Sequence, residues 1–262
     1  MRTVAPSAAV ARYVRDFMFV ETREVVTRLR LPEMGFVLGV RSGGAARFVD
    51  DDTAVPALSL TGVSRHARAM ETSGGGAVVL ARFHPSGAAR VFGPRLHEFF
   101  GRTEALDALF SRSEVDRLHT RVAEASTDHA RVSTLEAFLL QHAQREGDPL
   151  VDHALRRIHD DPSLRIRALA RETGLSHDAF EKRFRREVGC APKQYASLAR
   201  VHAALRLHRP ERSLTQLALE AGYFDQPHFN REFRAAVGVA PGAYLRASRR
   251  LKHSRRHSTT RQ

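Results

Sequence analysis

The stretch GLSHDAFEKRFRREVG, residues 174–189, carries the pattern that decides the fold of the C-terminal part of this chain. Phe180, Phe184 and Val188 recur every four residues, which predicts a helix with one buried apolar stripe. The remaining surface of this helix is rich in basic residues: Lys182, Arg183, Arg185 and Arg186. A narrow basic helix of this kind is typical of the second helix in a helix-turn-helix unit.

A shorter helix precedes this stretch and should end at Gly174, because glycine readily adopts the left-handed conformation that stops a helix. Its apolar positions are Ile166, Leu169 and Ala170. Ser176 is a good N-cap for the helix that follows. Two helices joined through Gly-Leu-Ser predict a helix-turn-helix, with the second helix as the recognition helix.

The same pattern occurs a second time at residues 222–238, GYFDQPHFNREFRAAVG. Phe229 takes the place of Phe180, and one extra residue lies in the second turn. Both repeats close with a glycine, an alanine-proline pair and a tyrosine, at residues 189–195 and 238–244. One helix-turn-helix match is a weak signal, whereas two in register with matching exits form a strong one.

Residues 150–248 resemble the DNA-binding domain of AraC/XylS-type transcription regulators. The resemblance rests on the turns, the aromatic positions and the exits of both repeats: Leu169, Ala170, Gly174, Leu175, Ser176, Phe180, Phe184, Gly189, Pro192, Tyr195, Leu217, Ala218, Gly222, Tyr223, Phe224, Asp225, Gln226, His228, Phe229, Arg231, Phe233, Arg234, Gly238, Val239, Pro241 and Tyr244. It implies a domain of seven helices in which one long helix, expected at residues 192–208, joins two helix-turn-helix units. It also implies that each recognition helix enters one of two successive major-groove segments of double-stranded DNA, with RNA polymerase as a further partner.

Carried over position by position, the resemblance places the base-facing residues of the first unit at His177, Asp178, Glu181 and Lys182, with Arg185 near the phosphates. Lys182 can donate to guanine and Glu181 can accept from cytosine. A carboxylate repels phosphates, so Glu181 is either a base reader or an outward-facing residue without a role in binding. Asp178 is better explained by the helix N-terminus, where negative charge is favourable.

The corresponding positions of the second unit are Gln226, Pro227, His228, Asn230 and Arg231, with Arg234 as a phosphate contact. Glutamine and asparagine suit adenine, and arginine suits guanine. Asp225 is the predicted N-cap, and Pro227 falls in the first turn, where its missing N–H costs nothing. Ser213 should cap the first helix of this unit, whereas its counterpart Arg165 cannot cap the first helix of the other.

Charge is distributed unevenly along the 262 residues, which suffice for two ordinary domains. The net charge is +13. Residues 151–262 hold 23 basic and 11 acidic residues, whereas residues 1–150 hold 19 and 18. The excess positive charge therefore lies with the helix-turn-helix units, which favours a nucleic acid as the partner.

Residues 1–145 predict a β-rich domain that ends in helices, so the whole chain is an α+β protein of two domains. Residues 8–20 indicate a short helix that runs into a first strand, and turn residues separate the runs that follow. The further predicted strands are 26–31, 34–40, 46–49, 57–60 and 77–83, consistent with a small barrel or sandwich. The predicted helices are 95–109, 112–125 and 128–145. Residues 146–149 are the expected linker, 150–248 the DNA-binding domain, and 249–262 a basic tail expected to be disordered in isolation.

The first domain resembles, more weakly, the N-terminal domain of one branch of the same regulator family. The matching residues are Tyr13 and Val14, the Leu60-Thr-Gly62 turn, and the strand end at residues 82–87. The resemblance implies a sensing or oligomerisation module, which would take a small-molecule effector or form a homodimer. Control of DNA binding through this domain is therefore expected.

Other functions are compatible with parts of the sequence. A cupin-like barrel could bring His66, His84 and His97 together on a metal, which would make the first domain an enzyme or small-molecule module. A non-specific architectural DNA binder would need the charge, but it would not need Gln226, Asn230 and Arg231 aligned on one helix. No catalytic residue, cofactor or metal site is predicted.

The single cysteine, Cys190, cannot form an internal disulfide, which fits a reducing cytoplasm. It is expected to be structural rather than a nucleophile, because it falls in the turn after the first recognition helix. No stretch approaches the roughly 20 apolar residues of a membrane span. The N-terminus meets charge too early for a secretory signal, so a cytoplasmic protein without a membrane partner is expected.

Overall fold

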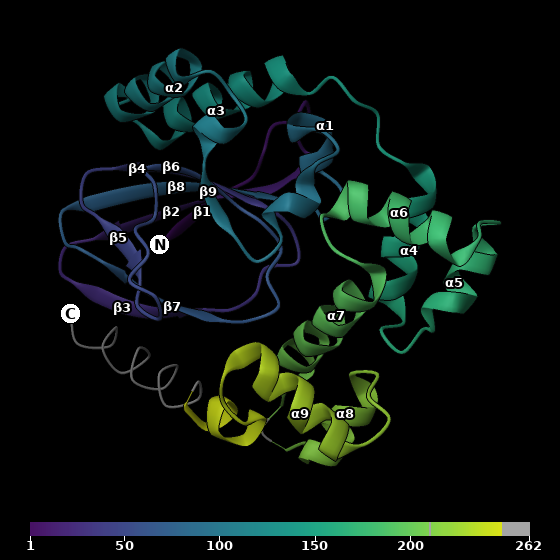
Figure 1. The fold of residues 1–262 in the computed structure, drawn as a ribbon. Coiled ribbons are helices and arrows are strands. Elements are labelled where there is room, and N and C mark those ends of the chain that lie inside the picture. The colour runs from purple at the N-terminus through teal and green to yellow at the C-terminus, as the bar shows by residue number, and fades with distance from the viewer. Residues whose placement is uncertain (210, 248–262) are drawn as a thin grey trace.

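The structure, a computed structural model, describes residues 1–209 and 211–247. A β-rich N-terminal domain is followed by an all-helical C-terminal domain (Figure 1). The predicted α+β class with two such domains is confirmed. The predicted basic tail, residues 249–262, lies outside the described residues.

Two antiparallel sheets form the N-terminal domain (Figure 1). The larger sheet contains, in spatial order, β1 (Arg2–Val4), β2 (Val14–Thr22), β8 (Gly76–Phe83), β4 (Val37–Ser42), β6 (Leu58–Thr61) and β9 (Thr103–Ala105). The smaller sheet contains β3 (Val26–Arg30), β7 (Arg68–Thr72) and β5 (Ala46–Phe48). The pairing of β2, β8 and β4 makes the central part of the large sheet, and the small sheet lies against one of its faces.

The other face of the large sheet is covered by α2 (Arg112–Glu124) and α3 (Asp128–His142), as Figure 1 shows. Phe17 and Phe19 of β2 point to this side and are buried in the main core. Side chains alternate across a strand, so the residues between them face the small sheet. That alternation gives the domain one densely packed side and one less filled interior.

The opening motif and the strand-end motif of the N-terminal domain lie against each other. A Cβ atom at Gly87 would come within 2.1 Å of the carbonyl oxygen of Tyr13, so only glycine fits there. The amide of His84 donates to the same oxygen at 2.8 Å. The backbone at residues 84–87, after the end of β8, therefore packs against the carbonyl group of Tyr13.

Two of the local predictions are wrong. Residues 95–109 do not form one helix but two short 3-10 helices, η1 (Leu96–Phe99) and η2 (Leu106–Ala108), separated by β9. Thr103 of β9 pairs with Thr61 of β6, and their hydroxyl groups lie 3.1 Å apart, so sheet pairing overrides the local helical pattern. Residues 8–13 form turns instead of a helix, because so short a segment before β2 cannot propagate one.

The C-terminal domain contains seven helical segments in its described part, as the resemblance implies. They are α4 (Pro149–Asp160), α5 (Ile166–Glu172), α6 (His177–Val188), α7 (Pro192–Leu207), α8 (Leu214–Glu220), α9 (Gln226–Val237) and residues 241–247. The long helix α7 joins the two helix-turn-helix units, which lie near its opposite ends (Figure 1). Between α3 and α4, residues 143–148 have no regular structure; the expected linker begins there, and Pro149 is the first residue of α4.

The two domains are joined by packing as well as by the chain. One apolar core runs from the large sheet through α1 (Ala88–Phe92) into α4, α5 and α6, and a smaller one holds α8 and α9. Hydrogen bonds join the N-terminal domain to α4, α7 and α9: Ser86 Oγ to Asp152 Oδ1 at 2.6 Å, His202 Nε2 to Pro32 O at 2.8 Å, and Ala67 N to Ala236 O at 2.6 Å. The recognition helices are therefore held by the N-terminal domain in this structure.

Candidate nucleic-acid interface

The two helix-turn-helix units repeat each other in their packing. Each unit stacks three aromatic rings in the same order: Phe180, Phe184 and Tyr195 in the first, and Phe229, Phe233 and Tyr244 in the second. Successive ring centroids are 5.8 and 5.6 Å apart in the first unit, and 5.5 and 5.8 Å apart in the second. Burial of one apolar face in each unit leaves the basic face of α6 and of α9 toward solvent.

The helix starts agree with the sequence predictions. The side chain of Ser176 accepts from the amide of Ala179 at 3.3 Å, and Asp225 accepts from the amide of His228 at 2.7 Å. Ser213 caps α8 in the same manner, whereas Arg165 provides no side-chain cap for α5. The caps fix where α6 and α9 begin and therefore which side chains occupy their first turns.

On α6, the predicted base-facing residues His177, Asp178 and Lys182 are exposed. Glu181 is half-buried, and its carboxylate lies 2.9 Å from Arg185 Nη2 and 3.9 Å from His177 Nε2. The carboxylate therefore neutralises part of the positive charge that α6 presents. Among the described residues, Lys182 has no ion pair, so it is the free cation of this face.

A groove of about 780 Å³ runs beside α6. It brings together four of the five residues predicted for the first unit, Asp178, Glu181, Lys182 and Arg185. Five further residues line it that were not assigned to the site from the sequence: Pro94, His97, Ala179, Arg183 and Arg186. Pro94 and His97 belong to the N-terminal domain, and nothing local in the sequence signals that they approach the first recognition helix.

A charged contact below this groove joins the domains. Glu187 of α6 is 1% exposed, and its carboxylate accepts from Arg145 Nη2 at 3.2 Å. Arg145 also donates to the carbonyl oxygen of Ala89 in α1 at 3.3 Å. A buried charge is stable only when it is paired, so Arg145 holds α6 and α1 together through Glu187.

On α9, Arg231 and Arg234 are exposed, and neither has an ion pair within the described part of the chain. The other predicted residues are engaged by the protein itself. Gln226 accepts from the hydroxyl of Thr215 at 2.6 Å, and His228 Nε2 lies 3.4 Å from Glu232. The side-chain oxygen of Asn230 is buried and has no hydrogen-bond partner among the residues that the structure describes. The two arginines are thus the groups of α9 that are free to meet an anion.

Arg200 of α7 fixes the orientation of α9. Its guanidinium donates to both carboxylate oxygens of Glu232 at 3.2 and 3.0 Å, and it lies over the Tyr223 ring at 5.4 Å from the centroid. Partial burial opposes ionisation of Glu232, but the charge of Arg200 and the hydrogen bonds to the carboxylate together outweigh burial and lower the pKa of that carboxyl. The pair links the spacer helix to the second recognition helix.

One exposed apolar residue at the site went unassigned in the sequence. Phe224 is 86% exposed and immediately precedes Asp225, the cap of α9. A large apolar side chain that remains in solvent next to a recognition helix is a candidate contact for a thymine methyl group. The one feature of the sequence that points to Phe224 is its position in the turn of the second unit, which is one residue longer than the turn of the first.

The groups considered for other chemistry lie apart. Burial raises the pKa of Cys190 to about 12, so this thiol is not a nucleophile at neutral pH. His66 Nδ1 lies 2.7 Å from the carbonyl oxygen of Ala235, His97 lines the groove beside α6, and burial lowers the pKa of His84. In residues 1–209 and 211–247, no three histidine, cysteine, aspartate or glutamate side chains gather as a metal site. None of the described helices combines the length and apolar character needed to cross a membrane.

Two sequence families match the chain. Residues 169–247 match the family described as "Helix-turn-helix domain", and residues 2–104 match a "Domain of unknown function (DUF6597)". The C-terminal domain is therefore a helix-turn-helix DNA-binding domain.

Among curated proteins, an AraC-like transcription regulator of Streptomyces lividans is 29% identical over 147 residues, which is 50% of this chain and 48% of the relative. The regulator MtrA of Neisseria gonorrhoeae is 26% identical over 100 residues, 37% of this chain and 33% of the relative.

These matches place the helix-turn-helix domain, residues 169–247, with those of AraC-type transcription regulators. The chain spans half or less of the length of these two relatives. Among solved structures, ToxT of Vibrio cholerae is 12% identical with a TM-score of 0.45, over 87% of this chain and 96% of that chain. The DNA-binding domain of AdpA, solved with a target DNA, is 30% identical with a TM-score of 0.35, over 39% of this chain and 91% of that chain. Both TM-scores are low, so the family assignment rests on the sequence matches.

Proposed function

We propose that this protein regulates transcription by binding specific sites on double-stranded DNA, with α6 and α9 in two successive major-groove segments. The observation that carries the proposal is the repeated unit itself. Two capped helices, each buried on its phenylalanine side and basic on the other, are joined by the single rigid helix α7. Regulation from a bound site implies RNA polymerase as the second partner.

The roles of the residues follow from their exposure and charge. Arg231 and Lys182 are free cations at predicted base-facing positions, where each can donate to guanine. Arg234 lies one turn further along α9, where it would meet a phosphate. Phe224 would contact a thymine methyl.

Binding isotherms on a protected target and on scrambled DNA test this function. We expect Arg231→Ala to cost roughly 1–3 kcal/mol on the target and to relax specificity at one base. Arg234→Ala should weaken binding to both DNAs alike and reduce the salt slope by about 1. Equal affinity of the unsubstituted protein for both DNAs would instead indicate a non-specific architectural binder.

We further propose that the N-terminal domain controls DNA binding by restraining both recognition helices. Pro94 and His97 form one wall of the groove beside α6, and His66 lies against the C-terminal end of α9. A duplex must therefore approach α6 past residues of the other domain, and α9 can tilt only if the contact at His66 opens.

The restraint at α9 can be tested in the full chain by His66→Ala, with His129→Ala as the matched control. His129 is an exposed histidine of α3, away from both recognition helices. We expect His66→Ala to bind DNA more tightly, because one of the two hydrogen bonds that hold the end of α9 is lost and only that of Ala67 N to Ala236 O is kept, and His129→Ala to bind as the unsubstituted protein does. Unchanged affinity in both variants would contradict the restraint but would leave the DNA-binding function intact.

A further inference from the structure

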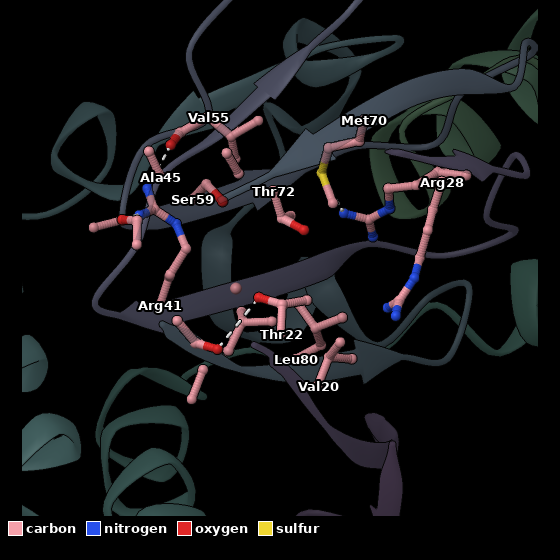
Figure 2. Close-up of a pocket in the computed structure, with 18 of the residues that line it drawn as sticks. Val20, Thr22, Arg28, Arg41, Ala45, Val55, Ser59, Met70, Thr72 and Leu80 are labelled. Carbon is pink, nitrogen blue, oxygen red and sulfur yellow. Dashed lines mark hydrogen bonds between the residues drawn. The ribbon is translucent and has the colours of Figure 1, made fainter. Parts of the chain in front are cut away.

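The interior of the N-terminal domain is not filled by side chains. A cavity of about 280 Å³ lies between the large and the small sheet (Figure 2). Protein interiors are close-packed, and voids larger than a water molecule are few. An apolar cavity of about 150 Å³ is large enough to hold benzene, so this one has room for a larger organic molecule.

Much of the cavity wall is apolar. Met18 and Val20 of β2, Val37 of β4 and Leu80 of β8 line it from the large sheet. These residues alternate with the ones that are buried beneath α2 and α3, so the sheet is apolar on both faces although helices cover only one. Val37 and Leu80 are already buried, whereas Met18 and Val20 are half-buried, so a ligand with an apolar body would cover these two and gain the free energy of removing them from water.

The charged groups of the wall all carry the same sign. Arg28 and Arg30 of β3 and Arg41 of β4 line the cavity, and no aspartate or glutamate is among the described residues that do so. Arginines elsewhere on these sheets have carboxylate partners, as Arg47 does with Glu71 at 2.9 Å. The unbalanced positive charge is therefore a feature of the cavity and not of the domain as a whole.

In the described part of the chain, the partners of Arg41 are neutral groups. Its guanidinium donates to the carbonyl oxygens of Gly44 and of Val55, the latter at 2.9 Å, and both of these residues line the cavity too. Figure 2 shows Arg41 beside Ala45 and Val55 at one end of the cavity. Burial lowers the pKa of Arg41, and no carboxylate opposes this. A guanidinium has five N–H donors, so donors remain for an anion.

Arg30 of β3, like Arg41, has a neutral partner, which is Met70 on the neighbouring strand β7. Its guanidinium lies 3.6 Å from the Met70 sulfur, which is a weak acceptor. Burial lowers the pKa of Arg30 although Glu33 acts in the opposite direction, and the Glu33 carboxylate lies 3.6 Å from Arg15. Arg30 thus contributes a second cation to the cavity without a strong acceptor of its own.

We propose that this cavity binds a small organic monoanion, an apolar body bearing one acidic group of the carboxylate or sulfonate type. The acidic group would accept hydrogen bonds from Arg41 or Arg30, and the body would lie on Met18, Val20 and Leu80. Paired donors on a guanidinium match the two oxygens of such a group. That the ligand alters DNA binding rests on the control by the N-terminal domain proposed above, whereas the binding itself does not.

Two fluorescent probes of the same aromatic body test the ligand class on the full-length protein. 8-Anilinonaphthalene-1-sulfonate carries the acidic group, and N-phenyl-1-naphthylamine is its neutral counterpart. We expect Arg41→Met to weaken binding of the sulfonate about tenfold or more and to leave binding of the neutral probe unchanged. Arg47→Met is the matched control, because Arg47 lies on the same domain outside the cavity, and it should change neither.

Leu80→Trp, which fills the cavity, should abolish binding of both probes. The proposal is overturned if Arg41→Met affects both probes equally, or if Leu80→Trp leaves sulfonate binding intact. Circular dichroism establishes that each variant is folded, and Arg30→Met replaces Arg41→Met if the latter is not.

A saturating concentration of the sulfonate should also change the affinity of the unsubstituted protein for DNA. Binding without that change would contradict the regulatory role of the ligand and would support the ligand class.

Discussion

The ring of Phe36 lies directly against the backbone of Gly189, across the boundary between the two domains. A Cβ atom at Gly189 would come within 2.8 Å of two carbons of that ring and 3.2 Å from the carbonyl oxygen of Leu96. Gly189 ends α6 with φ at 82°, and its repeat counterpart Gly238 ends α9 with φ at 86°. No atom of residues 1–209 or 211–247 lies within 4 Å of a Cβ at Gly238. The two glycines share one backbone conformation and differ in the interdomain contact.

Gly189→Ala should therefore destabilise the protein more than Gly238→Ala does. Both substitutions force an L-residue into the left-handed region, which costs about 1–2 kcal/mol. Gly189→Ala also overpacks the contact with Phe36, which should add about 1–3 kcal/mol. Urea unfolding of the two variants measures the difference. Equal losses would mean that the domains separate freely at this contact.

The ion pair between Arg200 and Glu232 should make stability depend on pH. Because the pKa of Glu232 is lowered in the folded protein, the pair stabilises it above the ordinary glutamate pKa of about 4.3 and loses that effect as pH falls through the lowered value. Glu232→Gln should cost about 1–3 kcal/mol at pH 7 and progressively less below pH ~4. The free energy of unfolding at the two pH values is the measurement.

Glu220→Gln is the control for that series. Glu220 pairs with Arg212 at 2.9 Å, but its side chain is 43% exposed against 25% for Glu232, so the loss should stay within about 1 kcal/mol. A loss at Glu220 as large as at Glu232 would show that the buried pair has no special role in fixing α9.

Cys190 should resist alkylation in the native protein. Its side chain is buried and its pKa is raised to about 12 by that burial, so both access and thiolate are lacking between pH 7 and 9. Iodoacetamide labelling followed by mass spectrometry should give full modification only after denaturation. Rapid labelling at pH 8 would reveal an opening of the domain interface next to α6.

Glu181→Ala should increase affinity for every DNA sequence. The carboxylate of Glu181 lies 2.9 Å from Arg185, so its removal frees that guanidinium for phosphates and deletes a negative charge. Isotherms on target and scrambled DNA should both move toward tighter binding. A loss confined to the target would instead identify Glu181 as the reader of a cytosine.

Phe224→Ala should weaken DNA binding without lowering stability, since a side chain that is 86% exposed contributes little to the core. The loss should be about 1 kcal/mol or more on a target with thymine at the contacted step. Leu219→Ala, at another exposed apolar residue of the same unit, is the control for general surface effects. Unchanged affinity of the Phe224 variant would remove this residue from the interface.

Local sequence signals were sufficient to predict the two helix-turn-helix units. The stop at Gly174, the cap at Ser176 and the stripe through Phe180 and Phe184 all lie within one short segment, so each is legible without knowledge of the rest of the chain. The same reasoning failed at residues 95–109. There, the strand β9 exists because Thr103 meets Thr61, a partner 42 residues away.

The sequence alone thus determined two basic recognition helices, their caps and their spacing, because periodicity and capping act over a few residues. Tertiary structure alone decided that Pro94 and His97 border α6, that Glu181 is tied to Arg185 and that Asn230 has a buried oxygen. It also decided that Arg30 and Arg41 line one cavity without a carboxylate. Such contacts depend on how strands and helices that are distant in the sequence pack together. The sequence shows that a side chain is charged, but it does not show which charged groups lie next to it in the folded protein.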